Sequence, residues 1–191
     1  MGLDMYLKRK KWIGTQYQYK GREFEGIVSI KLNGKEIPID FNNIDTIVES
    51  AAYWRKANAI HRWFVENVQK RNDDCGEYTV SLEDLENLLK LCKKVKSKAI
   101  IKEGKVENGY SFDENLNKIP NYVEGKYIEN AEEIAKILPT QEGFFFGCTN
   151  YDQWYMQDID YTIETLSKII KEEKKLNKEH FYSDFTYHAS W

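Results

Sequence analysis

Near its first residue the chain has a run in which apolar and polar side chains alternate: residues 3–8 read Leu-Asp-Met-Tyr-Leu-Lys. Alternation with a period of two is typical of a strand that buries one face, so Leu3, Met5 and Leu7 are expected to point into a core. Residues 181–191 alternate in the same way and predict a closing strand. Because terminal strands are usually held by pairing, we expect the first and last strands to be neighbours.

Helical patterns occupy the middle of the chain. Apolar side chains recur at spacings of three and four over residues 50–69 and predict a first helix. A capping-box pair, Ser81 and Asp84, opens a second amphipathic helix. A third and longer helix is expected to begin after Asn150 or Asp152, because both side chains suit an N-cap.

Turn signals and polar stretches place the remaining segments. Asn33-Gly34 lies between two β-prone runs, residues 22–32 and 35–41, and predicts a tight hairpin because both residues tolerate positive φ. Residues from about 98 to 127 are polar and contain glycine and proline, so we expect a surface insertion there. Strands at both ends with helices between them indicate a single α+β domain over residues 1–191. Its antiparallel sheet is expected to include both terminal strands and to be covered by three main helices.

The composition argues against several function classes. The chain has 191 residues, with 28 basic and 31 acidic side chains and a formal net charge of −3. Nucleic-acid binding over a broad surface favours a basic excess and a DNA mimic favours a dense acidic excess, so direct nucleic-acid binding is not expected. Three irregularly spaced cysteines indicate reduced thiols. The lack of an apolar leader, or of a run of about 18 apolar residues, predicts a cytoplasmic protein with no membrane partner.

Residues 53–63 contain the side chains that best suit a ligand. On the expected helix, Trp54, Asn58 and His61 follow one edge and present a stacking plane, an amide and an imidazole. Arg55 and Lys56 add two cations nearby, which suits a flat anionic ligand such as a nucleotide. The alternative, that Trp54 and His61 are packed core residues and the cations are solvated, stays open.

A second candidate segment is rich in glycine and phenylalanine. Gly143 and Gly147 flank three phenylalanines that begin with Phe144, and glycine allows a backbone to approach a ligand closely. No Lys-Ser/Thr pair follows, so the segment does not match a phosphate loop. It could instead be a buried strand with glycine turns.

The polar face of the two terminal strands could complete the site. If these strands pair, Asp4 and Tyr6 share one face with polar residues of the closing strand. We expect this surface to lie beside Trp54 and His61. The alternative is that it is only the solvated side of the sheet.

Catalytic and metal-binding patterns are weak. Three histidines and three cysteines form no pair with metal-ligand spacing, so no metal and no cofactor are expected. An enzyme needs a base and an electrostatic stabiliser that converge on one point. His61 with Arg55 or Lys56 is the set that can be assembled. We therefore name no catalytic residue and expect a binding protein rather than an enzyme.

Motifs along the whole chain resemble those of a family of small proteins found in phages, prophages and bacterial genomes. They are GLDMY at residues 2–6, YWRK at 53–56 with His61, GFFFG at 143–147 after Leu138-Pro139-Thr140, and the closing Ser190-Trp191. Members often carry the label phosphoglycerate kinase, which is a larger two-domain enzyme, and no glycine loop in a βαβ setting supports that label here. The insertion over residues 98–127 and the single closing tryptophan depart from the family pattern.

The resemblance implies a phage-type accessory protein that acts by binding in the cytoplasm of a host cell. We expect it to sequester a small anionic, nucleotide-like ligand and so to counter host defence. The alternatives are a protein inhibitor of a host CRISPR-type nuclease and a small nucleotide-processing enzyme. A homo-oligomer is left open.

Overall fold

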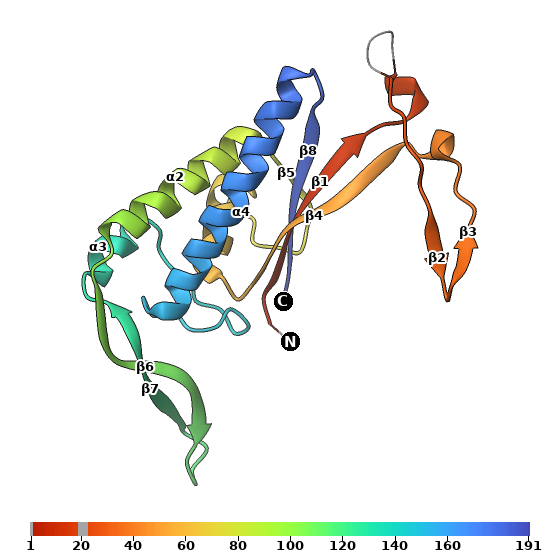
Figure 1. Cartoon of the computed structure of the whole chain (residues 1–191). Helices are drawn as coiled ribbons and strands as arrows, with labels where there is room; N and C mark the ends of the chain where they lie inside the picture. The colour runs from red at the N-terminus through yellow and green to blue at the C-terminus, as the bar shows by residue number, and fades with distance from the viewer. Residues whose placement is uncertain (1, 19–22) are drawn as a thin grey trace.

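A four-stranded antiparallel sheet forms the centre of the computed structural model, which describes residues 2–18 and 23–191 (Figure 1). The strand order is β4-β1-β8-β5, and the bounds are Asp4–Trp12 (β1), Thr46–Arg55 (β4), Tyr78–Val80 (β5) and Ser183–Ser190 (β8). Asp4 lies opposite Ser190 and Lys11 lies opposite Ser183. The prediction that the two terminal strands are neighbours is therefore confirmed.

Three helices of more than seven residues, counted over the described residues, cover one face of this sheet. They are Asn58–Asn67 (α1), Leu82–Lys98 (α2) and Gln153–Lys178 (α4). Helices α2 and α4 pack side by side (Figure 1), and the ring of Phe64 on α1 stacks 3.9 Å from the ring of Tyr187 on β8. Met5 and Leu7 on β1 are fully buried beneath the helices. The predicted α+β class, with an antiparallel sheet and three main helices, is confirmed.

Side-chain caps set the starts of the two long helices. The Ser81 hydroxyl accepts a hydrogen bond from the Asp84 backbone N–H, and the Asp84 carboxylate accepts one from the Ser81 N–H, which completes the predicted capping box of α2. Asp152, rather than Asn150, is the N-cap of α4 and accepts from the backbone N–H groups of Trp154 and Tyr155. Each of these bonds satisfies a donor that the first helical turn would otherwise leave unpaired.

The first helix is shorter than predicted, because the expected helix over residues 50–69 is wrong in its first part. Residues up to Arg55 belong to β4, where Ala52 lies opposite Leu7 and Trp54 opposite Met5. Lys56 then turns the chain with a φ of 59°, and α1 begins two residues later. Residues 50–55 have helical spacing, but pairing with β1 places them in the sheet. Tertiary contacts commonly override such local preferences.

Two hairpins project from the sheet and its helices (Figure 1). The first joins Ile30–Leu32 (β2) to Lys35–Ile37 (β3) through the predicted Asn33-Gly34 turn, with φ angles of 51° and 79°. Its arms are shorter than expected, and Arg22, where the first arm was expected to begin, lies outside the described residues. The second hairpin occupies the expected insertion and pairs Ile101–Phe112 (β6) with Lys118–Ile128 (β7).

Short elements complete the chain. They are the 3₁₀ turns Thr15–Tyr17 (η1) and Phe41–Asn43 (η2) and the helix Ala131–Ala135 (α3). Within the described part of the chain, no helix has the length and apolar character needed to cross a membrane.

Candidate functional site

An open cleft of about 1130 Å³ lies where four parts of the chain meet. Its walls are the β6–β7 hairpin, the loop of residues 140–150, the first turns of α4, and the junction between β4 and α1. Six of the ten residues predicted for a ligand site line it: Arg55, Lys56, Asn58, Gly143, Phe144 and Gly147. The structure thus brings together two segments that are far apart in the sequence.

The junction wall is built by a close contact between backbones. Lys56 has a left-handed φ of 59°, which is unusual for a residue with a side chain, and its backbone N–H donates to the Leu3 carbonyl at 2.8 Å. Gly147, with a φ of 86°, lies against it, and a Cβ on Gly147 would be 3.3 Å from the Lys56 Cβ. Glycine is therefore required here by its own conformation and by its neighbour.

Asn58 fixes the 140–150 loop at the end of the cleft. Its buried amide donates to the carbonyls of Phe146 at 3.1 Å and of Cys148 at 2.8 Å. Its side-chain oxygen accepts from the Gln141 backbone N–H at 3.4 Å. The amide that we predicted to contact a ligand is therefore committed to holding the loop.

His61 lies beneath this loop rather than in the cleft. It is fully buried; its Nδ1 is 2.8 Å from the Tyr187 hydroxyl and its Nε2 is 3.0 Å from an Asp73 oxygen. The other Asp73 oxygen accepts from the Gln141 side chain at 2.6 Å. Burial lowers the pKa of His61 although Asp73 opposes this, so the imidazole is neutral near pH 7. His61 is a positioning residue for the loop that carries Phe146.

Trp54 is a core residue and not part of a ligand edge. It lies on β4 with 2% of its surface exposed, and its indole N–H donates to the Thr162 hydroxyl of α4 at 2.9 Å. The predicted edge of Trp54, Asn58 and His61 required all three on one helix. Because Trp54 precedes the helix, that edge does not form.

Asp4 and Tyr6 lie on the opposite face of the sheet from His61. The Tyr6 ring stacks on His188 at 5.8 Å and packs against Tyr53, whose hydroxyl donates to Asp4. Strand neighbours alternate between faces, so Tyr187 reaches His61 while His188 reaches Tyr6. The predicted composite surface of the terminal strands beside His61 is therefore wrong.

The cleft has a cationic side and an acidic side. Arg55, Lys56 and Lys118 supply the positive charges, and the Arg55 Nε lies 3.9 Å from its nearest carboxylate, on Asp4. Glu107, Asp152 and Asp158 supply the negative charges. Two poles of opposite charge in one cleft suit a ligand that carries both an anionic group and hydrogen-bond donors.

The acidic pole contains two carboxyl groups in unusual surroundings. Asp152 is 3% exposed; one oxygen caps α4, and the other is buried without a hydrogen-bond partner among the described residues. Burial, followed by the nearby charge of Asp152, raises the pKa of Asp158 to about 7. Retaining a carboxyl group in such a place is costly and is typical of functional sites.

Sequence reasoning missed the acidic pole and the hairpin wall. The two aspartates match a cap and a helix start, so their pattern in the sequence has a structural explanation. The hairpin residues Glu107, Tyr110 and Lys118 come from a segment expected to be a surface insertion. Only the fold shows that this segment forms a hairpin that closes one side of the cleft.

Metal ligands do not gather anywhere in the part of the chain that the structure describes: no group of three or more His, Cys, Asp or Glu side chains could hold an ion. Cys92 is buried, and Cys75 and Cys148 are exposed free thiols. Burial, which is the largest cause, raises the pKa of Cys148, so this cleft residue is a poor nucleophile near neutral pH.

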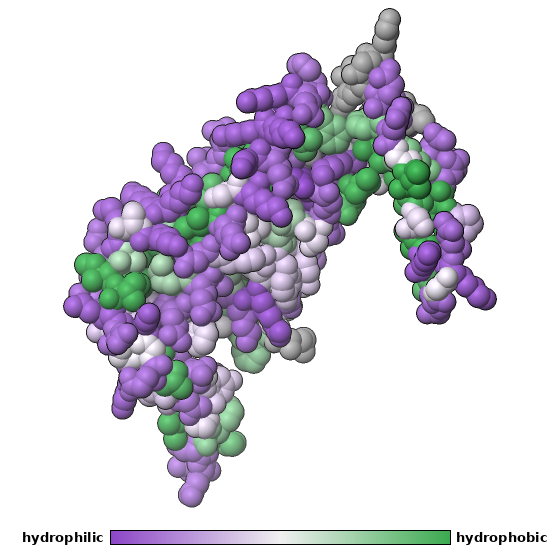
Figure 2. Space-filling model, in the orientation of Figure 1, coloured by the Kyte–Doolittle hydropathy of each residue, from purple (hydrophilic) through white to green (hydrophobic). Residues whose placement is uncertain are grey.

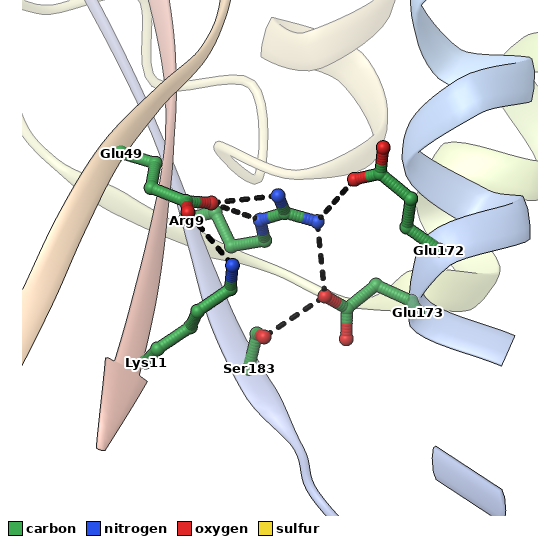
Figure 3. Close-up of polar contacts among 6 residues, drawn as sticks. All are labelled: Arg9, Lys11, Glu49, Glu172, Glu173 and Ser183. Carbon is green, nitrogen blue, oxygen red and sulfur yellow. Dashed lines mark hydrogen bonds and ion pairs between the residues drawn. The ribbon is translucent and has the colours of Figure 1, made fainter. Parts of the chain in front are cut away.

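A separate cluster of charges ties the sheet to α4 and is structural (Figure 3). The Arg9 guanidinium, 9% exposed, lies between Glu49 of β4, at 2.6 Å, and Glu172 and Glu173 of α4, at 3.1 and 3.3 Å. Lys11 donates to the second oxygen of Glu49 at 2.7 Å. Because these groups satisfy one another, the cluster leaves no open position for a ligand.

Comparisons with protein-family models, curated proteins and solved structures found no significant match to this chain.

Proposed function

We propose that the cleft binds a small anionic, nucleotide-like ligand and that the protein acts by sequestering it. The observation that carries this proposal is the meeting of three cations, exposed aromatic rings and a buried acidic pole around one cleft. The buried carboxyl groups and the exposed Phe144 ring are costly in the protein alone, and each kind of group suits a different part of a nucleotide.

The cationic side would hold the phosphate. Arg55 and Lys56 are exposed and adjacent, and among the described residues neither has a carboxylate within normal hydrogen-bond distance. Lys56 has the strained left-handed backbone described above, and such strain persists where the surrounding structure enforces it, often at ligand sites. Guanidinium and ammonium groups are the usual partners of phosphate oxygens.

Aromatic rings and carboxylates would hold the base. Phe144 is 93% exposed and Trp154 is partly exposed, which is unfavourable for apolar rings without a partner but suits stacking on a base. Asp152 and Asp158 would accept hydrogen bonds from the ring and exocyclic N–H groups of the base. A purine nucleotide would satisfy both poles, because its phosphate suits the cations and the N–H groups of its base suit the carboxyl groups.

The family resemblance in the sequence supports the biological role that we propose. A phage or mobile-element accessory protein that removes a nucleotide-like signal in the host cytoplasm would counter host defence. His61 is buried and outside the cleft, so the enzyme alternative lacks the base on which it relied.

A protein inhibitor of a host nuclease is the second candidate, and the two projecting hairpins favour it. They expose large apolar side chains, among them Ile30 and Leu32 on the first hairpin and Tyr110 and Phe112 on the second. Figure 2 shows hydrophobic surface on both hairpins. Exposed aromatic and aliphatic side chains are common anchors of protein interfaces.

The ligand is tested with protein purified from a phage-infected or native-like host. Heat-denatured protein should release a nucleotide-type compound that mass spectrometry identifies, and that compound should bind again to stripped protein in calorimetry. If nothing is released and a panel of mono-, di- and cyclic nucleotides does not bind, the proposal fails.

Two variants locate the site. Phe144→Ala should weaken binding roughly 5- to 150-fold, the range expected for one stacked base, without changing stability because the ring is exposed. Ile27→Ala, which removes a similarly exposed apolar side chain that does not line the cleft, is the matched control. Arg55→Gln with Lys56→Gln should also weaken binding, whereas Lys31→Gln with Lys35→Gln should not.

The same variants separate the two candidates. Full nucleotide binding by Phe144→Ala and by the Arg55 and Lys56 variant would place the ligand elsewhere and contradict the cleft proposal. Capture of a host nuclease that is lost on substitution of Leu32 or Phe112, with no nucleotide binding, would favour the inhibitor.

A further inference from the structure

Helices α2 and α4 line a second groove of about 530 Å³. Five lysines surround it: Lys93 from α2 and Lys171, Lys174, Lys175 and Lys178 from α4. Leu89 and Ile170 form part of its lining between them. The hydrophilic surface over these helices is visible in Figure 2.

The spacing on α4 places its four lysines on one stripe. Positions 171, 174, 175 and 178 are related by steps of three and four, so their side chains share one face of the helix. The stripe is about 10 Å long from Lys171 to Lys178. Lys93 adds a charge from the neighbouring helix, so the groove has cations on both of its sides.

Most of these charges lack an acidic partner. Lys174 forms an ion pair with Glu86 at 2.6 Å. The other four lysines have no ion pair among the described residues, and the nearby Glu172 is already engaged by Arg9. A chain with a net charge of −3 therefore holds a local excess of about four positive charges on this surface.

This arrangement destabilises the free protein. Like charges at spacings of four, such as Lys171 with Lys175 and Lys174 with Lys178, repel each other by a few tenths of a kcal/mol each. The helix dipole favours Lys175 and Lys178 in the last turns of α4. It does not account for Lys171, one turn earlier, or for Lys93 on the other helix.

We propose that the α2–α4 groove binds the sugar-phosphate backbone of a nucleic acid. A linear row of ammonium groups matches a linear row of phosphates, whereas a single small anion would need the donors to converge on one point. Lysine binds phosphate as a point charge without reading a base, so the contact is expected to be independent of sequence. The groove lies apart from the cleft, and this inference does not rest on the proposed function.

Salt dependence of binding to a short labelled DNA duplex tests the groove. Each phosphate contact contributes about −0.9 to the slope of log Kobs against log salt, so the four unpaired lysines predict a slope of about −3.6. Lys171→Gln with Lys175→Gln and Lys178→Gln should make the slope shallower by about 2.7 and weaken binding at low salt. The neutral substitutions keep the side-chain stems and avoid the helix destabilisation that glutamate would cause at this end of α4.

A charge-matched control removes three lysines elsewhere: Lys31→Gln, Lys35→Gln and Lys105→Gln, all exposed on the hairpins. This control should keep the wild-type slope, and so should the Arg55 and Lys56 cleft variant. Equal loss in the control and the groove variant would mean that only total charge matters and would overturn the proposal. No duplex binding at low salt, or binding of an acidic peptide in place of the duplex, would also overturn it.

Discussion

Some residues of the cleft lower the stability of the fold because their charged groups are buried, and Asp158 is the clearest example. Burial and the charge of Asp152 raise its pKa to about 7 from an ordinary value of 3.8. Between these two values the unfolded chain has lost the proton that the folded chain still holds. The contribution of Asp158 to stability therefore falls as pH rises through this window, and above it the ionised group destabilises the fold.

We predict that Asp158→Asn raises the free energy of unfolding at pH 8. The gain should shrink as pH falls from about 7 toward 3.8, because the wild-type carboxyl becomes neutral in both states. Urea unfolding of both proteins over a pH series measures this difference. Equal stability at every pH would show that Asp158 is well solvated, and a simultaneous loss of ligand binding would support its place in the acidic pole.

His61 acts on the cleft without touching it, and its replacement should show this. We predict that His61→Phe lowers the free energy of unfolding by about 1–3 kcal/mol, because the buried Tyr187 hydroxyl loses its partner. Ligand binding should also weaken, because the loop loses its anchor through Asp73. His180→Asn, at an exposed position with a φ of 57° that asparagine tolerates, is the control.

The pH dependence of His61 has the opposite sign to that of Asp158. Its pKa in the fold is below the ordinary 6.5, so the unfolded chain binds a proton first as pH falls. The contribution of neutral His61 to the free energy of unfolding is complete above about pH 6.5. It is lost as the pH falls toward the pKa of His61 in the fold. Wild-type protein should therefore lose more stability than His61→Phe between pH 7 and pH 5. Parallel pH profiles of the two proteins would contradict this assignment.

At the scale of elements, the position of the β6–β7 hairpin decides whether the cleft has its second wall. The Gln153 side chain, in the first turn of α4, accepts from the Lys126 backbone N–H at 3.0 Å. It sits directly over Gly125, where a Cβ would meet Val106 at 2.5 Å and Gln153 at 2.7 Å. Glycine at this point lets the hairpin lie against the start of α4.

Gly125→Ala should therefore loosen the hairpin and weaken ligand binding with little effect on the sheet. Hydrogen exchange should quicken at β6 and β7 but not at β1 and β8, because the clash is confined to the base of the hairpin. Adding Val106→Ala to Gly125→Ala removes the closest clash, keeps the bond from Lys126 to Gln153, and should restore part of the protection. Faster exchange throughout the chain would mean that Gly125 supports the whole fold.

At the scale of the whole molecule, the Arg9 cluster joins the sheet to the far end of α4 (Figure 3). Glu173 is 2% exposed and accepts from Arg9 at 3.3 Å and from the Ser183 hydroxyl at 2.9 Å. Removing Arg9 would leave this carboxylate buried with a single neutral donor. A buried charge without its partner is strongly destabilising.

We predict that Arg9→Met costs about 3–5 kcal/mol in thermal or chemical unfolding. Arg9→Met with Glu173→Met should cost less than the single change, because no buried charge then remains unpaired there. Lys96→Met, which breaks an exposed pair with Asp160, should cost only about 0–1 kcal/mol. A double variant no more stable than Arg9→Met would show that the cluster does not act through charge pairing.

The sequence by itself determined the features that depend on local patterns. Alternation predicted both terminal strands, and the Asn33-Gly34 turn and the Ser81–Asp84 capping box were predicted from short-range chemistry that holds wherever those residues occur. The cations and glycines of the cleft could also be named in advance. Arginine and lysine are rarely buried, and glycine permits close approach of a backbone, and both properties are visible without a fold.

Only the tertiary structure decided which of these residues meet. Residues 50–55 have helical spacing, but β1 offers a pairing partner, so Trp54 enters the core and not a ligand edge. Alternation in β8 sends Tyr187 and His188 to opposite faces and so separates His61 from Tyr6. The cleft itself joins the ends of four distant segments, and such long-range contacts depend on packing energies that no local pattern in one sequence contains.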